Sequence, residues 1–332
     1  MERVTFDPWR HRYAAACAGA TVVLLAAGGL VTSTGSGLAV PDWPLSFGTV
    51  FPAMTGGVLF EHGHRLVAAA VGLMTVVLAA WFGRRERRAW VRRLACVAIA
   101  AVVAQGLLGG LTVLLRLPPS VSVLHACLAQ GFFCVVVVLA LATTRGFTDR
   151  APARFEHDGP PPLWALGAAA TGLVYGQLIL GAVMRHTGAA LAIPDVPLAF
   201  GRLVPPILSF EIAVHFAHRV GALLVAAAVL GLSGRVLRRH RARPELVRPA
   251  LLAVVLVAVQ IGLGAAAVLT RLAVLPATAH VVVGALILAT CLTLTLRAAR
   301  CRPAAAPAGH GTRAAGEAPP ARRAPRAAGS AA

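Results

Sequence analysis

Four histidines carry the most informative spacing in this sequence. His64 and His125 lie 61 residues apart, and His218 and His280 lie 62 residues apart. Neutral imidazole is a strong axial ligand for haem iron, and two histidines on facing helices can hold a porphyrin from both sides. The matched pairs therefore predict two haem sites. A lone histidine is more often a hydrogen-bonded helix cap, but matched spacing disfavours that alternative, and no cluster offers the three or four ligands of a zinc site.

An internal repeat relates the two pairs. The segment TGSGLAVPDWPLSFG, from Thr34, returns as TGAALAIPDVPLAFG, from Thr187. Equivalent residues lie 153 to 155 positions apart, namely Asp42 and Asp195, His64 and His218, Gln105 and Gln260, and His125 and His280. The PDWP and PDVP segments predict turns that cover the haem sites, and the two glutamines predict interhelical hydrogen bonds. The chain is thus expected to contain two copies of one four-helix unit.

Glu61 breaks this repeat. It stands three residues before His64 in EHGHR, where one helical face would carry both, and His215 takes its place in HFAHR. A general base or charge stabiliser requires a carboxylate near the reacting atom. The N-terminal site is therefore predicted to be catalytic and the C-terminal site auxiliary. The alternative is a carboxylate that only favours a helix N-terminus. Trp43 is replaced by Val196 in the second loop, so any special role belongs to the N-terminal site.

Arg65 and Arg219 follow the first histidine of each pair. A guanidinium at that place can form bidentate hydrogen bonds with a haem propionate. It can equally anchor a helix at the membrane interface. The sequence leaves both interpretations open.

The elements that must position these residues are membrane helices. Of 332 residues, 58% are hydrophobic and 13% charged, with a mean hydropathy of +0.77, which is not a soluble composition. Helices are expected because lipid offers no partner for backbone groups. Eight apolar segments are long enough, and the four histidines are expected to open the second, fourth, sixth and eighth. The segments are 13–32, 65–83, 94–115, 121–142, 163–184, 217–237, 250–270 and 279–297.

The predicted fold is all-α, with two pseudo-symmetric bundles of four transmembrane helices. The N-terminal bundle, with the substrate haem, takes residues 13–144, and the C-terminal bundle, with a cofactor haem, takes 163–298. Residues 1–12 form the N-terminus and 145–162 a linker. Residues 299–332 are rich in Ala, Pro, Gly and Arg and are expected to be a disordered tail on anionic lipid.

The arginines predict the orientation in the membrane. All 31 basic residues are arginine, 25 on one side of the predicted helices and six on the other. By the positive-inside rule, both termini and the linker are cytoplasmic, and the haem sites lie near the outer face of the cell membrane. The charge falls in short clusters between apolar runs, which argues against a nucleic-acid partner. The six cysteines show no CxxC spacing and are interpreted as core residues.

The sequence resembles the haem A synthase family from about residue 13 to 298. The motifs that carry the resemblance are GGLVTSTGSGLAVPDWPLSFG, EHGHR, QGLLGG with His125, IPDVPLAFG, HFAHR, and QIGLG with His280. The resemblance implies that haem O binds between His64 and His125 and is oxidised at a ring methyl to the formyl of haem A, for cytochrome oxidase assembly. Glu61 would be required for activity, and water is the implied oxygen source.

The same resemblance implies a haem b cofactor between His218 and His280, through which electrons leave. The implied partners are haem O synthase and an electron acceptor, besides membrane lipid. One feature departs from the family: many members carry cysteines in the outer loops. Here the corresponding residues are Val40 and Ser46 in the first loop, and Ala192 or Ile193 with Ala199 in the second. A loop disulfide is therefore not expected.

Two other functions compete with the enzyme. A di-haem electron carrier of the cytochrome b type would bind both haems permanently, but it has no evident need for Glu61. A transporter would explain repeats and intramembrane polar residues, yet not the paired intervals between histidines.

Overall fold

The apolar segments form long helices in the computed structural model, which describes residues 5–149, 154–155, 159–300 and 302–303. Within that part of the chain, eight helices are long and apolar enough to cross a membrane, which confirms the predicted all-α multi-pass fold. They are α1 (Pro8–Ser33), α2 (Gly57–Arg85), α3 (Ala89–Leu114), α4 (Pro119–Ala142), α6 (Leu163–His186), α7 (Phe210–Arg239), α8 (Pro244–Leu269) and α9 (Val274–Ala299).

The helices that carry the histidines begin earlier than predicted. α2 begins at Gly57 and α7 at Phe210, so His64 and His218 lie about two turns inside their helices. The prediction that the histidines open their helices is therefore wrong. The polar runs EHGHR and HFAHR lower the local hydropathy without interrupting the helix, and Ser209 caps α7 by accepting a hydrogen bond from the Ile212 N–H.

Short elements occupy the connections. The linker after α4 contains the single-turn helix α5 (Arg145–Thr148) and the two-residue strand β1 (Arg154–Phe155). β1 pairs in parallel with β2 (Arg302–Pro303), and the 3-10 turn η1 (Ala189–Leu191) follows α6. The rest of the predicted tail, from residue 304 onward, and Cys301 lie outside the described residues. The other five cysteines are free thiols.

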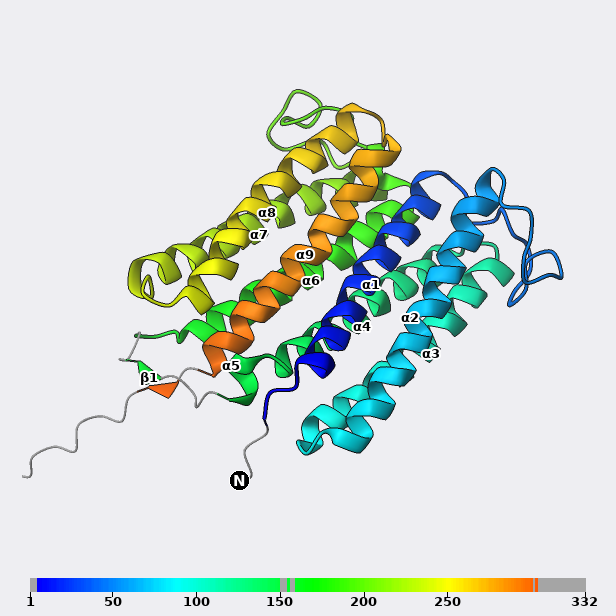
Figure 1. Cartoon of the computed structure of the whole chain (residues 1–332). Helices are drawn as coiled ribbons and strands as arrows, with labels where there is room; N and C mark the ends of the chain where they lie inside the picture. Colours follow the sequence, from blue (N-terminus) through cyan, green and yellow to red (C-terminus); the bar gives the residue numbers. More distant parts are fainter. Residues whose placement is uncertain (1–4, 150–153, 156–158, 301, 304–332) are drawn as a thin grey trace, which may run out of the picture.

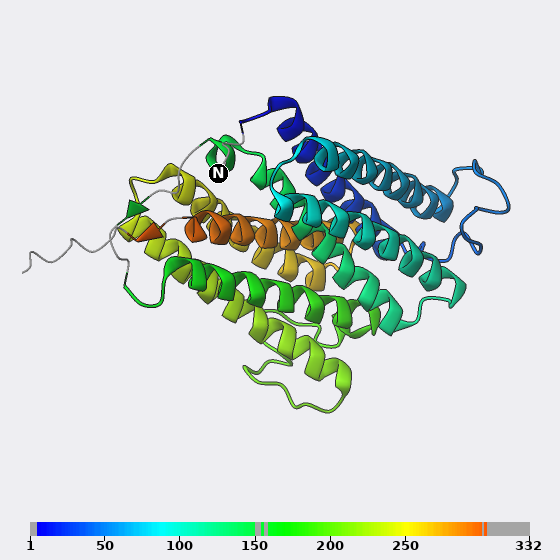
Figure 2. The ribbon, with the colours of Figure 1, turned by 90° about the horizontal axis from the view of Figure 1, so that it is seen from below.

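The eight long helices form two rings of four. α1 to α4 pack in order and α4 closes back on α1, while α6 to α9 pack in order and α9 closes back on α6. The rings meet through α1 with α9, and through α4 with α6 and α9. Figures 1 and 2 show the consequence: α1, α4, α6 and α9 lie centrally, with α2 and α3 on one flank and α7 and α8 on the other. This is the packing expected if the two sequence repeats fold alike.

The repeat extends to backbone conformation. The turn between α3 and α4 places Arg116 and Leu117 at φ 60° each, in the left-handed region. The turn between α8 and α9 does the same with Arg271 and Leu272, at φ 53° and 66°. Such angles are uncommon for residues other than glycine, so their recurrence 155 positions later indicates that both rings use the same turn.

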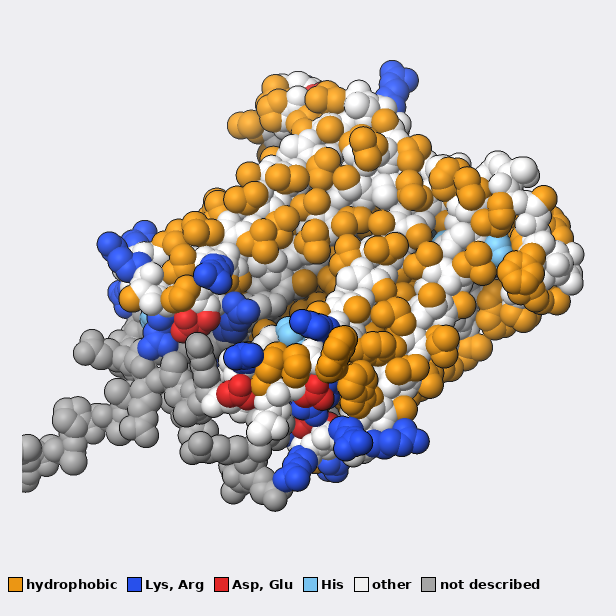
Figure 3. Space-filling model, in the orientation of Figure 1, with side chains coloured by type: hydrophobic (Ala, Val, Ile, Leu, Met, Phe, Trp, Pro, Cys, Tyr) orange, Lys and Arg blue, Asp and Glu red, His pale blue; other side chains and the backbone are white. Residues whose placement is uncertain are grey.

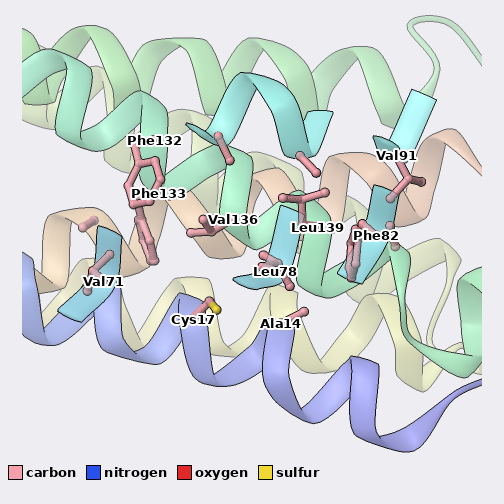
Figure 4. Close-up of a cluster of buried hydrophobic side chains, with 14 residues drawn as sticks. Ala14, Cys17, Val71, Leu78, Phe82, Val91, Phe132, Phe133, Val136 and Leu139 are labelled. Carbon is pink, nitrogen blue, oxygen red and sulfur yellow. The ribbon is translucent and has the colours of Figure 1, made fainter. Parts of the chain in front are cut away.

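Packing inside each ring fixes where the helices lie. Figure 4 shows the core of the first ring, where Leu78 and Phe82 of α2 belong to one buried cluster with Phe133, Val136 and Leu139 of α4. Lipid provides no hydrophobic drive between helices, so close van der Waals packing must hold them together. Small residues permit it where helices cross, and a Cβ at Gly167 of α6 would lie 2.7 Å from Oγ1 of Thr295 on α9.

The surface divides into an apolar belt and a basic end. In Figure 3, hydrophobic side chains cover the length of the helices, and arginines gather at the end where the described chain begins. At that end the buried Glu86 accepts from Arg10 of α1 at 3.3 Å and from Arg88 at 2.9 Å. These ion pairs fasten the α2–α3 connection to α1.

Candidate functional site

The two histidine pairs lie in separate rings, one pair in each. His64 of α2 and His125 of α4 belong to the first ring, and His218 of α7 and His280 of α9 to the second. The prediction of two sites at repeat-related places therefore agrees with the packing. Each site joins the second and fourth helix of its ring.

The geometry of these imidazoles suits a bis-histidine haem. The ring centroids of His218 and His280 lie 6.4 Å apart. Two imidazoles bound to one metal ion at about 2 Å each have centroids roughly 6 Å apart. Within the part of the chain that the structure describes, Nδ1 of His64, His125 and His280 is buried without a hydrogen-bond partner. A buried ring nitrogen without a protein partner fits a residue that serves a ligand.

Four glycines, which the sequence analysis did not single out, seat the four rings. A Cβ at Gly28 of α1 would lie 3.2 Å from Cε1 of His64, and the corresponding distances elsewhere are 3.0 to 3.1 Å. The other contacts are Gly109 with His125, Gly181 with His218, and Gly264 with His280. The glycines repeat at offsets of 153 and 155, close to the 154 and 155 of the histidines, and that periodicity was the available signal.

The glycine seats give a direct prediction for Gly181→Val. The new methyl groups would displace the His218 imidazole, so the ratio of haem b to protein in the purified chain should fall about tenfold, a size typical when the support of a metal ligand is lost. The measurement is haem absorbance per mole of protein. Gly176→Val on the same helix is the matched control, because a Cβ there meets nothing within 4 Å. Equal haem content in both variants would contradict the assignment.

Glutamines position two of the histidines. Gln105 of α3 donates from Nε2 to the His125 carbonyl at 2.9 Å, so its predicted interhelical role is confirmed. Gln177 of α6, which sequence reasoning missed, donates to the His218 carbonyl at 2.7 Å and places Nε2 3.0 Å from Nδ1 of that ring. Leu24 is the repeat equivalent of Gln177 and has no side-chain amide, so His64 lacks the glutamine contact that His218 has. Gln260 lies on α8 facing Gly284 of α9.

Glu61 is buried and held by two partners. Its Oε2 accepts from the Val40 N–H at 2.8 Å, and its Oε1 accepts from Nη2 of Arg65 at 2.7 Å. The helix thus places an ion pair at i and i+4, one turn from His64. Two hydrogen bonds satisfy this buried carboxyl group and fix its position one helical turn from His64.

The second ring repeats this arrangement without the carboxylate. Nδ1 of His215 accepts from the Ile193 N–H at 3.2 Å, and Ile193 is the repeat equivalent of Val40. His215 is buried, as Glu61 is. The two side chains therefore perform one structural task, because each ties its helix to the loop that precedes it. Only Glu61 adds negative charge.

Arg65 and Arg219 each bind the loop that precedes their own helix. Nη1 of Arg65 donates to the carbonyls of Asp42 at 2.8 Å and Leu45 at 2.9 Å. Arg219 donates to the carbonyls of Leu198, Ile193 and Asp195 at 2.8 to 3.0 Å. The terminal nitrogens are thus engaged by loop backbone. Contact with propionates stays a prediction for both residues.

Aspartates close both loops in the same way. The Asp42 carboxylate accepts from the N–H groups of Phe47 at 2.7 Å and Gly48 at 2.8 Å, and Asp195 accepts equivalently from Phe200 and Gly201 at 2.8 Å each. The Gly48 and Phe47 N–H groups hold the pKa of Asp42 below its ordinary value, because they stabilise the charged form. We call each set the aspartate clasp of its loop.

The aspartate clasp of the first loop should withstand mild acid. A carboxylate whose pKa is lower in the folded chain stabilises the fold fully above its ordinary pKa of about 3.9, and this stabilisation is lost as the pH falls through the lower folded value. Trp43 fluorescence should therefore stay constant from pH 7 to about 4 and change only below. Asp42→Ala should show the altered emission already at pH 7, whereas Asp195→Ala should not. A transition of the wild type near pH 6 would contradict this.

Two further contacts distinguish the first site. Nδ1 of His62, buried in α2, lies 2.8 Å from the Ser46 hydroxyl, and the equivalent residues Phe216 and Ala199 form no such bond. The Trp43 indole lies against Gly110, where a Cβ would overlap it. Trp43 thus covers α3 beside the Gly109 seat of His125. Nothing in the sequence predicted the hydrogen bond between His62 and Ser46, because one residue lies in a helix and the other in a loop 16 positions away.

A protein-family model and several known proteins match most of this chain. The family model COX15-CtaA, described as cytochrome oxidase assembly protein, matches residues 56–292, a range that includes all four histidines and Glu61. Proteins named heme A synthase from three bacteria are similar over most of the chain. The protein of Symbiobacterium thermophilum is 36% identical over 260 residues, covering 76% of this chain and 84% of the relative. That of Halalkalibacterium halodurans is 32% identical, covering 81% and 90%. That of Shouchella clausii is 34% identical, covering 75% and 83%.

Proposed function

Because this chain belongs to the COX15-CtaA family of cytochrome oxidase assembly proteins, we propose that it is a haem A synthase, which oxidises a ring methyl of haem O to the formyl of haem A. The substrate haem binds between His64 and His125 in the first ring. A haem b cofactor binds between His218 and His280 in the second. The observation that carries this assignment is the buried Glu61 beside only one of two otherwise matched histidine pairs.

The reaction divides between the two rings. Conversion of the methyl and one water into the formyl releases four protons and four electrons, by successive hydroxylation and loss of water from a geminal diol. Haem b, when bound, supplies a one-electron redox centre that carries electrons away from the substrate. Glu61 provides the fixed carboxylate near the substrate pair, where it accepts protons or stabilises positive charge that develops on the methyl carbon.

The residues beside the first histidine of each pair differ. Gln177 fixes His218 through the carbonyl contact, as suits a metal ligand. Leu24 has no side-chain amide for His64, and in the first ring the glutamine contact falls instead on His125, from Gln105. Arg65 and Arg219 contribute by holding the outer loops over the two sites, with any propionate contact added to that role.

The proposed setting follows from charge. Residues 13–144 carry the substrate site and 163–298 the cofactor site. Most arginines lie at the end of the molecule opposite the histidines, so the positive-inside rule places residues 1–12, the 145–162 linker and the 299–332 tail in the cytoplasm. Both haem sites then lie near the outer face of the cell membrane. Haem O synthase as donor and a separate electron acceptor complete the proposed set of partners.

The test is production of haem A in cells. The chain is expressed in a host that makes haem O but lacks haem A, and the extracted haems are separated by chromatography. Haem A should appear with the wild type and be absent with His64→Ala. Haem b alone, with haem O unchanged in both cultures, would instead support a di-haem electron carrier.

A further inference from the structure

Arg185 is an intramembrane cation at the junction between the two rings. It lies in the last turn of α6, and its Nη2 donates to the Gly29 carbonyl at 3.1 Å and to the Ser33 hydroxyl at 2.6 Å, both on α1. Thr278 of α9 donates to the same hydroxyl at 3.0 Å. One polar network thus joins three central helices, and on α9 it begins two residues before His280.

No carboxylate pairs with Arg185 in the part of the chain that the structure describes. The acidic residues at that end have other roles: Glu61 is paired with Arg65, and Asp42 and Asp195 form the aspartate clasps. Glu211 is exposed at the start of α7. A half-buried cation at membrane depth is costly, and the two neutral partners on α1 do not balance its charge, so an anionic ligand would stabilise Arg185.

The guanidinium retains donors for such an anion. Nη2 makes both protein contacts of the side chain, whereas Nε and Nη1 have no hydrogen-bond partner among the described residues. Both nitrogens are accessible, because neither is among the fully buried side-chain atoms that lack a hydrogen-bond partner. They can donate charge-assisted hydrogen bonds, which a carboxylate accepts best.

We propose that Arg185 binds a propionate carboxylate of the haem held by His218 and His280, an inference that rests on the proposed haem b site. Arg185 belongs to the same ring as that pair and is an electrostatic neighbour of His280. The internal repeat supports the second haem site over the first, because the first-ring residue equivalent to Arg185 is the uncharged Thr32. An anchored propionate suits a resident cofactor and would hinder release of a product.

The experiment compares iron protoporphyrin IX with its dimethyl ester, which lacks both carboxylates. Full-length chains purified from haem-deficient cells are titrated with each porphyrin. Binding to the second site alone is measured in a His64→Ala/His125→Ala background. There the free acid should bind at least tenfold more tightly than the ester. Arg185→Gln should abolish this preference, so that both porphyrins bind equally, while Arg185→Lys should keep part of it.

The matched controls separate a propionate contact from helix packing. Ser33→Ala removes a protein partner of Arg185 without its charge, and Arg202→Gln removes an exposed cation at the same end of the molecule. Both should keep the preference for the free acid. If Arg185 serves only to join α1 and α6, Arg185→Gln would weaken both porphyrins alike, and that result would overturn the proposal.

A second background identifies which haem is bound. In His218→Ala/His280→Ala, only the first site can bind, and Arg185→Gln should leave its selectivity unchanged. Loss of the preference there, and not in the other background, would assign Arg185 to the substrate and overturn the inference. Absence of porphyrin binding in every chain that retains Arg185 would instead overturn the proposed haem sites themselves.

The reduction potential offers an independent readout. Removing a cation at a propionate of the haem destabilises the reduced form, so Arg185→Gln should lower the reduction potential of the bound haem b. A tenfold change in the reduction equilibrium corresponds to about 59 mV for one electron. If Arg185→Gln changes neither the reduction potential of the haem nor the preference for the free acid over the dimethyl ester, the proposed contact is wrong.

Discussion

Glu61→Gln should abolish formation of haem A while leaving haem binding intact. The substitution preserves shape and one hydrogen-bond acceptor but removes the charge that Arg65 now neutralises. General acid–base groups contribute typically 10²- to 10⁴-fold to rate, so haem A should fall at least about a hundredfold. The measurement is haem A per mole of chain in a host that supplies haem O. Haem b content should stay at the wild-type level, because Glu61 is not one of the proposed ligands.

His215→Gln is the matched control for that change. It alters the repeat-equivalent residue, which ties the second loop through the Ile193 N–H but carries no carboxylate. Haem A should then fall less than about threefold, in line with the loss of one neutral hydrogen bond. If the two variants lose activity equally, loop anchoring explains both, and the catalytic role of Glu61 fails.

His280→Ala and His218→Ala should each remove haem b from the purified chain. An axial imidazole holds the iron, and the pair at 6.4 Å leaves room for one metal ion between the rings. We expect at least a tenfold lower ratio of haem b to protein, from absorbance and chromatography of extracted haem, with haem A formation lost as well. The loss follows because electrons from the substrate then have no acceptor within the chain.

His64→Ala separates the two sites. It should stop haem A formation as completely as His280→Ala, yet the haem b content should remain. A chain in which His64→Ala removes haem b, or in which His280→Ala retains it with unchanged absorption bands, would show that the cofactor and substrate sites are assigned to the wrong rings.

The histidine pairs could be predicted from the sequence because their spacing repeats, and a repeated spacing is visible without knowledge of the fold. The sequence also predicted that Glu61 and His215 occupy equivalent places, and the matched bonds to Val40 and Ile193 agree. Helix starts were predicted poorly, since polar residues inside a membrane helix lower the hydropathy that defines its ends. His64 was therefore expected at a helix start and lies well inside α2.

The contacts between helices could not be predicted from the sequence alone. Glycine is frequent throughout these segments, so the repeat spacing of Gly181 alone does not identify it as the seat of His218 until α6 and α7 are packed together. Gln177 likewise is one polar residue in an apolar helix until its amide meets the His218 carbonyl. Arg65 was considered as a propionate ligand or an interfacial anchor, and the loop carbonyls that it binds belong to residues at least 20 positions away.

The shared left-handed turns and aspartate clasps bear on how such a protein could arise. Both rings keep the same backbone turns, while the side chains around the histidines differ at a few places: Glu61 and His215, Ser46 and Ala199, Leu24 and Gln177. After a gene duplication, a handful of codon changes would suffice to divide labour between the copies. Neither copy would have needed a new backbone to acquire its own task.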